Sequence, residues 1–171
     1  KHDYPPRKLT DLYEVVGNAI TTFRRSRQTT AEVIVRVNPH SMAEVDAWEI
    51  ELAVLNLMKN AADAISGVED PKIEVMLMPQ DEKTWALSVA DNGPYIDDEQ
   101  LAALFKPLQT TKGSAGMGLG LSIVSSIAER HAGHVTVERN GLAGLRFTIT
   151  FPRKPEEGEN LADAMLPPKM Q

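Results

Sequence analysis

Two pairs of strand-like segments joined by short links constrain the fold more than any other feature of this sequence. Apolar and polar residues alternate over 73–77 and 85–89, and a loop at 79–83 connects these segments. The same alternation recurs over 134–138 and 145–151, again with a short loop between. A period of two predicts strands. Strands joined so closely must pair antiparallel, because a parallel pair needs a long crossover, so a doubly wound parallel sheet is excluded.

Helical periodicity accounts for most of the remaining chain. Apolar residues recur at helical spacing, and Asp46 and Asp97 stand where N-caps are expected. The expected helices span residues 9–23, 47–66, 98–105 and 119–130, and one more strand spans 31–37. The long helix should stop at Gly67 and bury a stripe formed by Trp48, Leu52, Leu55, Met58, Ala62 and Ile65. This order predicts an α+β fold with helices on one face of a mostly antiparallel sheet.

Composition limits the class of ligand and the compartment. The 171 residues include 18 Lys and Arg against 24 Asp and Glu, a net charge of −6, which argues against a general binder of nucleic acid or anionic membranes. The absence of cysteine excludes disulfides, cysteine zinc sites and thiol nucleophiles and fits a reducing compartment. No apolar run is long enough to span a bilayer, and no signal peptide is recognisable. Since the first residue is Lys1, a fragment of a longer protein is expected.

Three polar residues lie on one side of the expected long helix. Asn56, Asn60 and Asp63 are spaced i, i+4 and i+7, and at about 100° per residue they fall within an arc of about 60°. Asparagine oxygens are neutral, hard ligands that suit Mg²⁺ carrying phosphates and water. A solvated polar stripe opposite the core explains the same spacing equally well, so both interpretations stay open.

A second candidate lies just after the 85–89 segment, where Asp91, Asn92, Gly93 and Pro94 follow one another. These residue types are common in turns, so the segment alone favours an ordinary turn. The functional alternative is a buried Asp91 carboxylate that accepts a hydrogen bond from the exocyclic amine of a purine.

The third candidate is the stretch 112–121, with glycines at 113, 116, 118 and 120. Glycines let backbone N–H groups approach phosphate oxygens, and a following helix adds its N-terminal dipole. Two known phosphate loops are excluded, because a dinucleotide fingerprint needs glycine at Leu121 and a P-loop needs lysine at Leu119. A flexible linker is the alternative, but it does not explain why the apolar positions continue as a core-facing helix.

In this order, the segments resemble the ATP-binding catalytic domain of sensor histidine kinases, within the ATPase superfamily shared with DNA gyrase, Hsp90 and MutL. Residues 56–64 resemble the N box, 91–93 the G1 box, 104–112 the F box, 116–121 the G2 box and 144–147 the terminal strand. The F box, with Thr-Thr-Lys, is similar to that of kinases that sense nitrogen, oxygen or dicarboxylates. The resemblance implies a two-layer α/β sandwich of the Bergerat type, with a mixed, mostly antiparallel sheet. It covers residues 9–152, between a linker at 1–8 from a missing dimerisation segment and a tail at 153–171.

The resemblance also implies ATP and Mg²⁺ as ligands. Asn60 would ligate Mg²⁺, with Asn56 contributing directly or through water, and these two are the implied catalytic residues. Asp91 would read the adenine amine, and residues 106–117 would form the lid. The implied ATP contacts are Asn56, Lys59, Asn60, Asp63, Asp91, Gly93, Ile96, Phe105, Thr110, Thr111, Lys112, Gly116, Met117, Gly118, Leu119 and Gly120, of which Lys112 and Lys59 supply positive charge.

Three positions depart from the family pattern. Hydrolysing relatives place a glutamate where Asn56 stands, and an amide cannot act as a general base, so slow hydrolysis by the isolated chain is expected. Tyr95 replaces a G1 glycine and should narrow the adenine end of the pocket or move the turn, which would weaken nucleotide affinity. Leu108 replaces the second aromatic residue of the F box and should loosen the anchor of the lid.

The phosphate acceptor of such a kinase is missing from the chain. None of the histidines, His2, His40, His131 and His134, lies in a long helix with a His-Glu pattern, and His131 is expected to be stabilised by a helix dipole. The implied partners are a dimerisation and phosphoacceptor domain of the same protein and a response regulator receiver domain. This chain is expected in the cytoplasm, and the parent protein could be anchored in the inner membrane. No contact of this chain with nucleic acid or with the membrane is expected. A degenerate nucleotide-binding or interaction module is the alternative, and Asn56 disfavours a hydrolytic gyrase or Hsp90-type ATPase.

Overall fold

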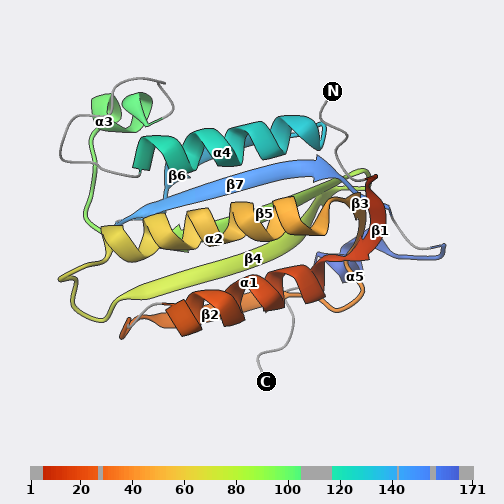
Figure 1. Cartoon of the computed structure of the whole chain (residues 1–171), viewed down its shortest axis with the longest axis horizontal. Coiled ribbons are helices and arrows are strands. Elements are labelled where there is room, and N and C mark those ends of the chain that lie inside the picture. The colour runs from red at the N-terminus through yellow and green to blue at the C-terminus, as the bar shows by residue number, and fades with distance from the viewer. Residues whose placement is uncertain (1–5, 27–28, 105–116, 142, 155–156, 166–171) are drawn as a thin grey trace.

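The computed structural model describes residues 6–26, 29–104, 117–141, 143–154 and 157–165. The strands among these residues are β1 (Lys8–Asp11), β2 (Glu32–Val37), β3 (Met42–Val45), β4 (Lys72–Asp81), β5 (Thr84–Asp91), β6 (His134–Arg139) and β7 (Leu145–Pro152). The helices are α1 (Leu12–Ser26), α2 (Ala47–Ala64), α3 (Asp98–Ala103), α4 (Met117–Arg130) and α5 (Leu161–Ala164). Figure 1 shows their arrangement. Strands β1 and β3 and helix α5 were not expected from the sequence pattern.

The main sheet has five strands in the order β2-β4-β5-β7-β6. Both expected hairpins are present, because β4 pairs antiparallel with β5, and β6 with β7. Strand β7 also pairs antiparallel with β5, which joins the hairpins into one sheet. Among the described strands of this sheet, only β2 is parallel to its neighbour, β4, since β3 and α2 lie between them in the chain and supply the crossover. The predicted α+β class with a mixed, mostly antiparallel sheet is confirmed.

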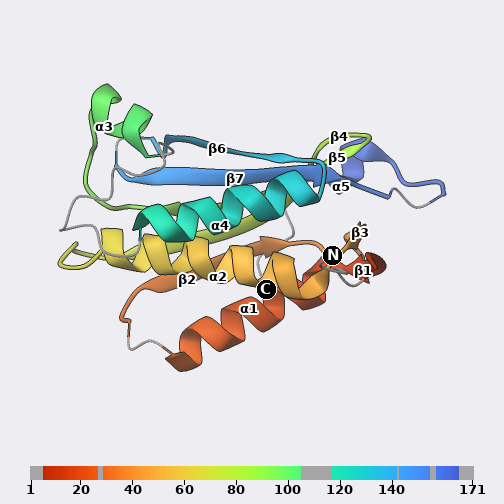
Figure 2. The same ribbon diagram turned by 45° about the horizontal axis from the view of Figure 1, so that its top comes forward.

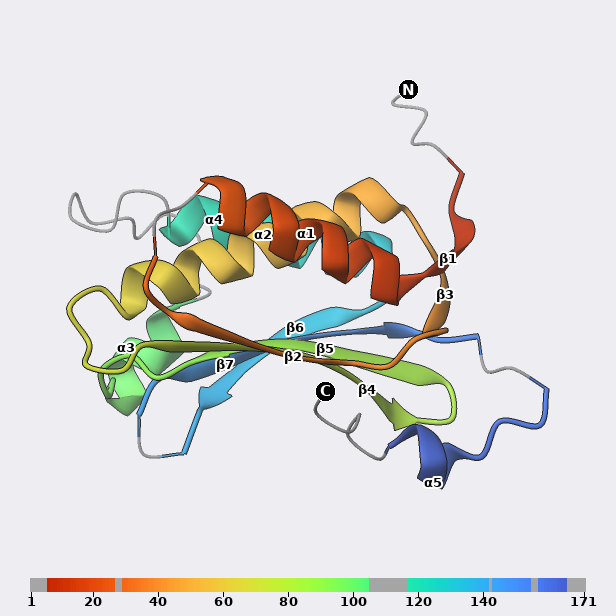
Figure 3. The same ribbon diagram turned by 90° about the horizontal axis from the view of Figure 1, so that it is seen from below.

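Three helices cover one face of this sheet and form the second layer of a sandwich. Helices α1, α2 and α4 lie side by side on that face, whereas α5 lies on the opposite face next to β4 (Figures 2 and 3). The core lies between the layers, and its strand side chains alternate as predicted. Ile73, Val75 and Leu77 of β4 are buried, as are Leu87 and Val89 of β5.

The first helix begins later than its apolar period suggests. Leu9 lies in β1 and is 61% exposed, and α1 begins only at Leu12. Asp11 precedes this start and accepts a hydrogen bond from the backbone N–H of Tyr13 at 3.0 Å. The expected start at Leu9 is therefore wrong, because pairing of β1 with β3 holds that residue extended although it is in phase with the helix.

The buried face of α2 also differs from the expected stripe. Asp46 caps the helix as predicted, but Trp48 in its first turn is 70% exposed. The buried apolar residues are Ile50, Ala53, Val54, Leu57, Met58 and Ala61. Of the expected stripe, only Met58 and Ile65 are fully buried, and Leu52, Leu55 and Ala62 are half-buried. Because α2 packs between α1 and α4 above the sheet, it buries a wide arc that a single stripe does not identify.

Polar contacts join the start of α2 to the end of α4. The Nε2 atom of His131, a buried side chain, accepts a hydrogen bond from the backbone N–H of Asp46 at 3.1 Å. The other ring nitrogen, Nδ1, lies 2.8 Å from the carbonyl oxygen of Ile127. Because Nε2 accepts, Nδ1 carries the proton of a neutral ring. Beside it, the Nε of Arg130 donates to the buried Glu49 carboxylate at 2.8 Å. His131 therefore lies at the end of α4 as predicted, and the contacts that hold it are these hydrogen bonds, whereas the expected stabilisation by the helix dipole stays a prediction.

The segment after β7 packs against the domain for part of its length. Arg153 is buried, with its guanidinium carbon 4.6 Å from the ring centre of Trp85, and it pairs with Glu159. Asn38 donates from Nδ2 to the carbonyl oxygen of Ala164 at 3.2 Å, which fixes α5 beside the sheet. Residues 153, 154 and 157–165 thus extend the fold, and the domain division at residue 152 stays a prediction. None of the helices in the described part of the chain is both long and apolar enough to cross a membrane.

Candidate functional site

Helices α2 and α4 bring two of the predicted asparagines to the start of α4. Gly120, in the first turn of α4, is buried. A Cβ atom on this residue would lie 3.3 Å from Oδ1 of Asn56 and 3.7 Å from Oδ1 of Asn60. The absence of a side chain therefore leaves the two amides facing the backbone of the helix start. At such a start the first N–H groups have no partner within the helix and favour anions.

The two amides differ in how they are satisfied. The Nδ2 of Asn56 donates to the carbonyl oxygen of Leu52 at 2.8 Å, which leaves its Oδ1 on the side of Gly120. Asn60 is 6% exposed, and its Nδ2 is buried with no hydrogen-bond partner among the residues that the structure describes. Such an unpaired buried donor costs about 1–3 kcal/mol, so a ligand that accepts a hydrogen bond there is stabilised.

This donor set fits Mg²⁺ that arrives with phosphate oxygens. The Oδ1 atoms of Asn56 and Asn60 are hard neutral ligands, and Mg²⁺ commonly keeps water and phosphate in most of its coordination positions. The described residues contain no group of three His, Cys, Asp or Glu side chains that could hold a metal alone. The residues present thus suit a cation shared with a ligand.

Asp91 ends β5 as a buried carboxylate. It is 5% exposed, and its Oδ1 accepts hydrogen bonds from the backbone N–H groups of Gly93 at 2.8 Å and Leu145 at 3.4 Å. Burial raises the pKa of Asp91, and these two hydrogen bonds offset only part of that effect. Because both backbone donors go to Oδ1, Oδ2 is the atom that can accept a hydrogen bond from a ligand.

The turn after Asp91 combines ordinary turn contacts with a buried carboxylate. Asn92 makes the turn contacts, since its Oδ1 accepts from the backbone N–H of Lys72 at 2.7 Å and its Nδ2 donates to the carbonyl oxygen of Asp70 at 2.9 Å. Asp91, by contrast, points its carboxylate into the protein. The turn interpretation therefore holds for Asn92, and the buried acceptor is Asp91.

Gly93 brings the end of α2 close to Asp91. A Cβ atom at this position would lie 2.9 Å from Oδ1 of Asp91 and 3.0 Å from the carbonyl oxygen of Ala64. Ala64 is the last residue of α2, one turn beyond Asn60. The carboxylate of Asp91 and the amides of Asn56 and Asn60 therefore border the same stretch of α2.

Two residues of the β6–β7 turn hold Asp91 from the other side. Gly144 has φ +78°, and a Cβ atom there would lie 2.0 Å from the carbonyl oxygen of Asp91, so the backbone fits only glycine. The Nδ2 of Asn140 donates to the same oxygen at 3.0 Å. The sequence pattern marks Gly144 only as the start of the terminal strand. Nothing in the pattern indicates Asn140, because its partner lies 49 positions away in the chain.

The other predicted ATP contacts are placed only in part. Lys59 and Asp63 are exposed on α2, and Ile96 is half-buried after the Asp91 turn. The backbones of Met117, Gly118 and Leu119 form the first turn of α4. Phe105, Thr110, Thr111, Lys112 and Gly116 lie outside the described residues, as do Leu108 and almost all of the predicted lid at 106–117.

The Tyr95 side chain lies at the surface, which disagrees with the expectation that it narrows the adenine end of the pocket. Its side chain is 65% exposed, and its ring centre lies 5.1 Å from the guanidinium carbon of Arg139. The described non-glycine residues with positive φ do not include Tyr95, so the turn is unstrained there. A pocket narrowed by this side chain is therefore not found, whereas the expected displacement of the turn and loss of nucleotide affinity stay predictions.

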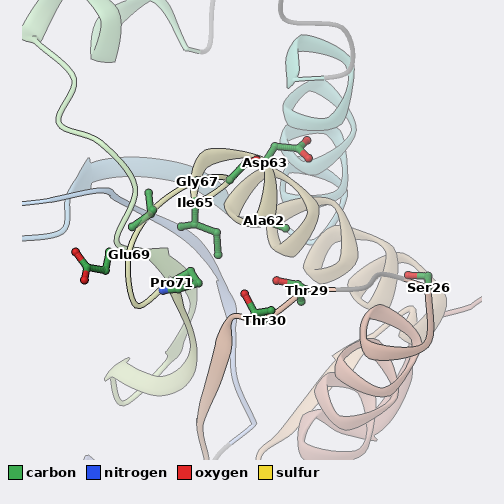
Figure 4. Close-up of a pocket in the computed structure, with 11 residues that line it drawn as sticks. Ser26, Thr29, Thr30, Ala62, Asp63, Ile65, Gly67, Glu69 and Pro71 are labelled. Carbon is green, nitrogen blue, oxygen red and sulfur yellow. The ribbon is translucent and has the colours of Figure 1, made fainter.

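A pocket of about 920 Å³ borders the same end of α2. Figure 4 shows that Thr29 and Thr30 line it below the end of α2, with Glu69 and Pro71 on the loop before β4. The Oγ1 of Thr29 is already engaged, because it accepts the backbone N–H of Ala31 at 3.1 Å. The predicted contact Asp63 borders this pocket. The lining does not include the two asparagines or the carboxylate described above.

Known proteins resemble this chain in sequence. A family model described as histidine kinase-, DNA gyrase B-, and HSP90-like ATPase matches residues 45–155. The C4-dicarboxylate transport sensor protein DctS of Rhodobacter capsulatus is 34% identical over 161 residues, which are 90% of this chain and 24% of that protein. The chain therefore spans only about a quarter of the length of this curated relative.

Solved structures match the fold over nearly the whole chain. The mycobacterial sensor histidine kinase MprB has a TM-score of 0.75 and 26% identity, covering 87% of this chain and 100% of that one. The catalytic domain of histidine kinase ThkA has a TM-score of 0.72 and 25% identity, covering 89% and 100%. The predicted two-layer architecture is thus that of solved histidine kinase domains.

Proposed function

The chain belongs to the histidine kinase-, DNA gyrase B- and HSP90-like ATPase family, and on this premise we propose that it is the catalytic domain of a two-component sensor histidine kinase. It binds Mg-ATP beside α2 and passes the γ-phosphoryl group to a histidine on a dimerisation domain outside this chain. The observation that carries the proposal is the buried, unpaired Nδ2 of Asn60 next to Gly120. A triphosphate oxygen supplies the acceptor that this donor lacks.

Each described site residue has one task in this function. Asp91 accepts the adenine N6 amine at Oδ2, and Gly93 leaves room for the ring beside the backbone. Asn60 would hold the metal through Oδ1, with Asn56 beside it, and the N–H groups in the first turn of α4 would donate to the phosphates. Mg²⁺ would neutralise part of the negative charge of the triphosphate. In the transfer, the bond from the γ-phosphorus to the bridging oxygen breaks, a P–N bond to the acceptor imidazole forms, and ADP leaves.

Asn56 separates this function from that of a hydrolytic ATPase. Its Nδ2 is committed to Leu52, and an amide oxygen is too weak a base to take a proton from water. The bound triphosphate is then available to the imidazole of another domain, and water hydrolyses it only slowly. Slow ATP hydrolysis by the isolated chain follows, and rapid turnover by protein free of contaminating ATPases contradicts the proposal.

Binding and transfer are tested in two steps. A fluorescent ATP analogue is titrated into the chain with and without Mg²⁺, and Asn60→Ala is expected to remove the Mg²⁺-dependent part of the affinity. Asn18→Ala, at an exposed position of α1, is the matched control and is expected to bind normally. The dimerisation domain of the parent protein is then added with γ-labelled ATP, and acid-labile label on its histidine supports the kinase.

The same experiment decides between the kinase and the alternative. Failure to bind at millimolar nucleotide supports a degenerate interaction module. Label that moves onward to a receiver domain identifies the response regulator as the second partner. Because ATP is the donor, the cytoplasm is the compartment that the proposal requires.

A further inference from the structure

Arg139, the last residue of β6, reaches across to the segment that follows Asp91. Its Nε donates to the carbonyl oxygen of Ile96 at 3.1 Å, and its terminal nitrogen donates to Asp98 at 2.5 Å. Its guanidinium carbon also lies 5.1 Å from the centre of the Tyr95 ring, within the range of a cation–π contact. One side chain therefore contacts three of the four residues between 95 and 98.

The core and Arg139 together fix the segment 95–98. The Ile96 side chain packs partly buried against the core, while its carbonyl oxygen is held by Arg139. The side chain of Tyr95, the neighbour of Ile96, is exposed, and its ring meets the guanidinium. The planar, always charged guanidinium suits this arrangement, because it can stack on a ring while its edge donates two hydrogen bonds.

We propose that Arg139 is a positioning residue for the nucleotide site, which holds the Tyr95 ring outside the space that adenine enters. The inference rests on the proposed function, since it concerns the site for the adenine ring. The bulky Tyr95, two residues after Gly93, is tolerated because Arg139 in the β6–β7 hairpin supplies a cation that holds the ring away from the adenine site. Without Arg139, the ring is free to rotate back over Gly93 and Asp91, and nucleotide must displace it.

The contact itself is tested without nucleotide. An NMR spectrum of the free protein should show a nuclear Overhauser effect between the Nε proton of Arg139 and the ring protons of Tyr95. This effect should be lost in Arg139→Ala while the remainder of the spectrum is retained. A missing effect in the folded wild-type chain overturns the proposal before any ligand is added.

The consequence is tested by Mg-ATP titration of four proteins: wild type, Arg139→Ala, Tyr95→Ala and the double variant. A cation–π contact at an exposed position is worth about 0.5–1 kcal/mol, so Arg139→Ala should raise Kd by about two- to fivefold. Tyr95→Ala should change Kd by less than about twofold, because the ring is already outside the site, and the double variant should match Tyr95→Ala. Arg36→Ala is the matched control, because this arginine of β2 has a similar side-chain exposure, 31% against 29%, and pairs with Glu74 away from the site.

The outcomes separate this inference from the proposed function. If wild type binds no nucleotide, the proposed function fails, and the NMR contact alone decides whether Arg139 holds the ring. If wild type binds and Arg139→Ala binds equally well, the positioning role is wrong. If Arg139→Ala weakens binding equally with and without the Tyr95 ring, Arg139 acts only on the backbone of the segment and the proposal is overturned.

Discussion

Replacing Asp91 by asparagine tests how the proposed site recognises adenine. The two side chains have the same shape, and asparagine keeps an oxygen for the backbone N–H groups of Gly93 and Leu145, which hold Oδ1 at 2.8 and 3.4 Å. The atom in the place of Oδ2 then becomes an NH₂ group. A donor therefore faces the adenine amine, itself a donor, and the hydrogen bond is lost.

The magnitude follows from the charge and burial of the carboxylate. A hydrogen bond to a charged group contributes about 1.5–3 kcal/mol, so Asp91→Asn should raise the Kd for Mg-ATP roughly 10- to 150-fold. Folding stability should not fall. Burial raises the pKa of Asp91, which means that the ionised form costs the folded state free energy at pH values above the unfolded pKa. An uncharged amide removes that cost.

The assay is calorimetric titration with Mg-ATP and Mg-ITP, whose base carries a 6-oxo group in place of the amine. Wild type should prefer ATP, and Asp91→Asn should lose or reverse this preference, because its NH₂ can donate to the 6-oxo group. Thermal denaturation without nucleotide checks that the variant is folded. An unchanged ratio of ATP to ITP affinity in a folded Asp91→Asn protein would refute adenine recognition by this carboxylate.

Three further changes test the site and the sheet. Gly144→Ala places a Cβ atom 2.0 Å from the carbonyl oxygen of Asp91 at φ +78°, so it should lower the free energy of unfolding by at least about 2 kcal/mol. Gly141→Ala is the control, because Gly141 has φ +65° but open space around it, and it should lower this free energy by only about 1 kcal/mol. Denaturant titrations measure both. Asn56→Glu should raise ATP hydrolysis about tenfold or more by adding a general base, and equal rates in Asn56→Glu and Asn56→Gln would contradict that reason. Burial alone would raise the pKa of Glu74, but hydrogen bonds and charges of Arg146 and Arg36 outweigh it and lower that pKa. The stabilisation is then present above the unfolded pKa and lost as the pH falls through the folded pKa, so Glu74→Gln should lower Tm at pH 7 and flatten its fall in acid.

The fold class was predictable because it depends on the number of residues between neighbouring elements in the sequence. Short links fix antiparallel pairing, and the spacing of Asn56 and Asn60 fixes their common side of α2 whatever the tertiary packing. The buried arc of α2 was not predictable in the same way. It depends on the helices on both sides, so Trp48 is exposed although it is in phase with the apolar period.

The supports of Asp91 were also beyond prediction from one sequence. Asn140 and Gly144 contact it only because β7 pairs with β5, and neither residue carries a local sign of that pairing. The same holds for Tyr95, whose position depends on Arg139 of β6. Residue types thus indicated where the candidate site lies, and long-range strand pairing determined which side chains hold Asp91 in place.

The strand order has a consequence for the synthesis of this protein. Strand β7 lies between β5 and β6, so Asp91 leaves the ribosome 54 residues before Leu145, the donor that helps to hold it. Until β7 docks, β5 has an open edge and the carboxylate lacks the turn that encloses it. A nascent chain is therefore unable to bind nucleotide at Asp91 until β7 has been synthesised, and ATP stabilises only molecules in which β7 has been inserted between β5 and β6. Ligand binding thereby reports the completion of folding.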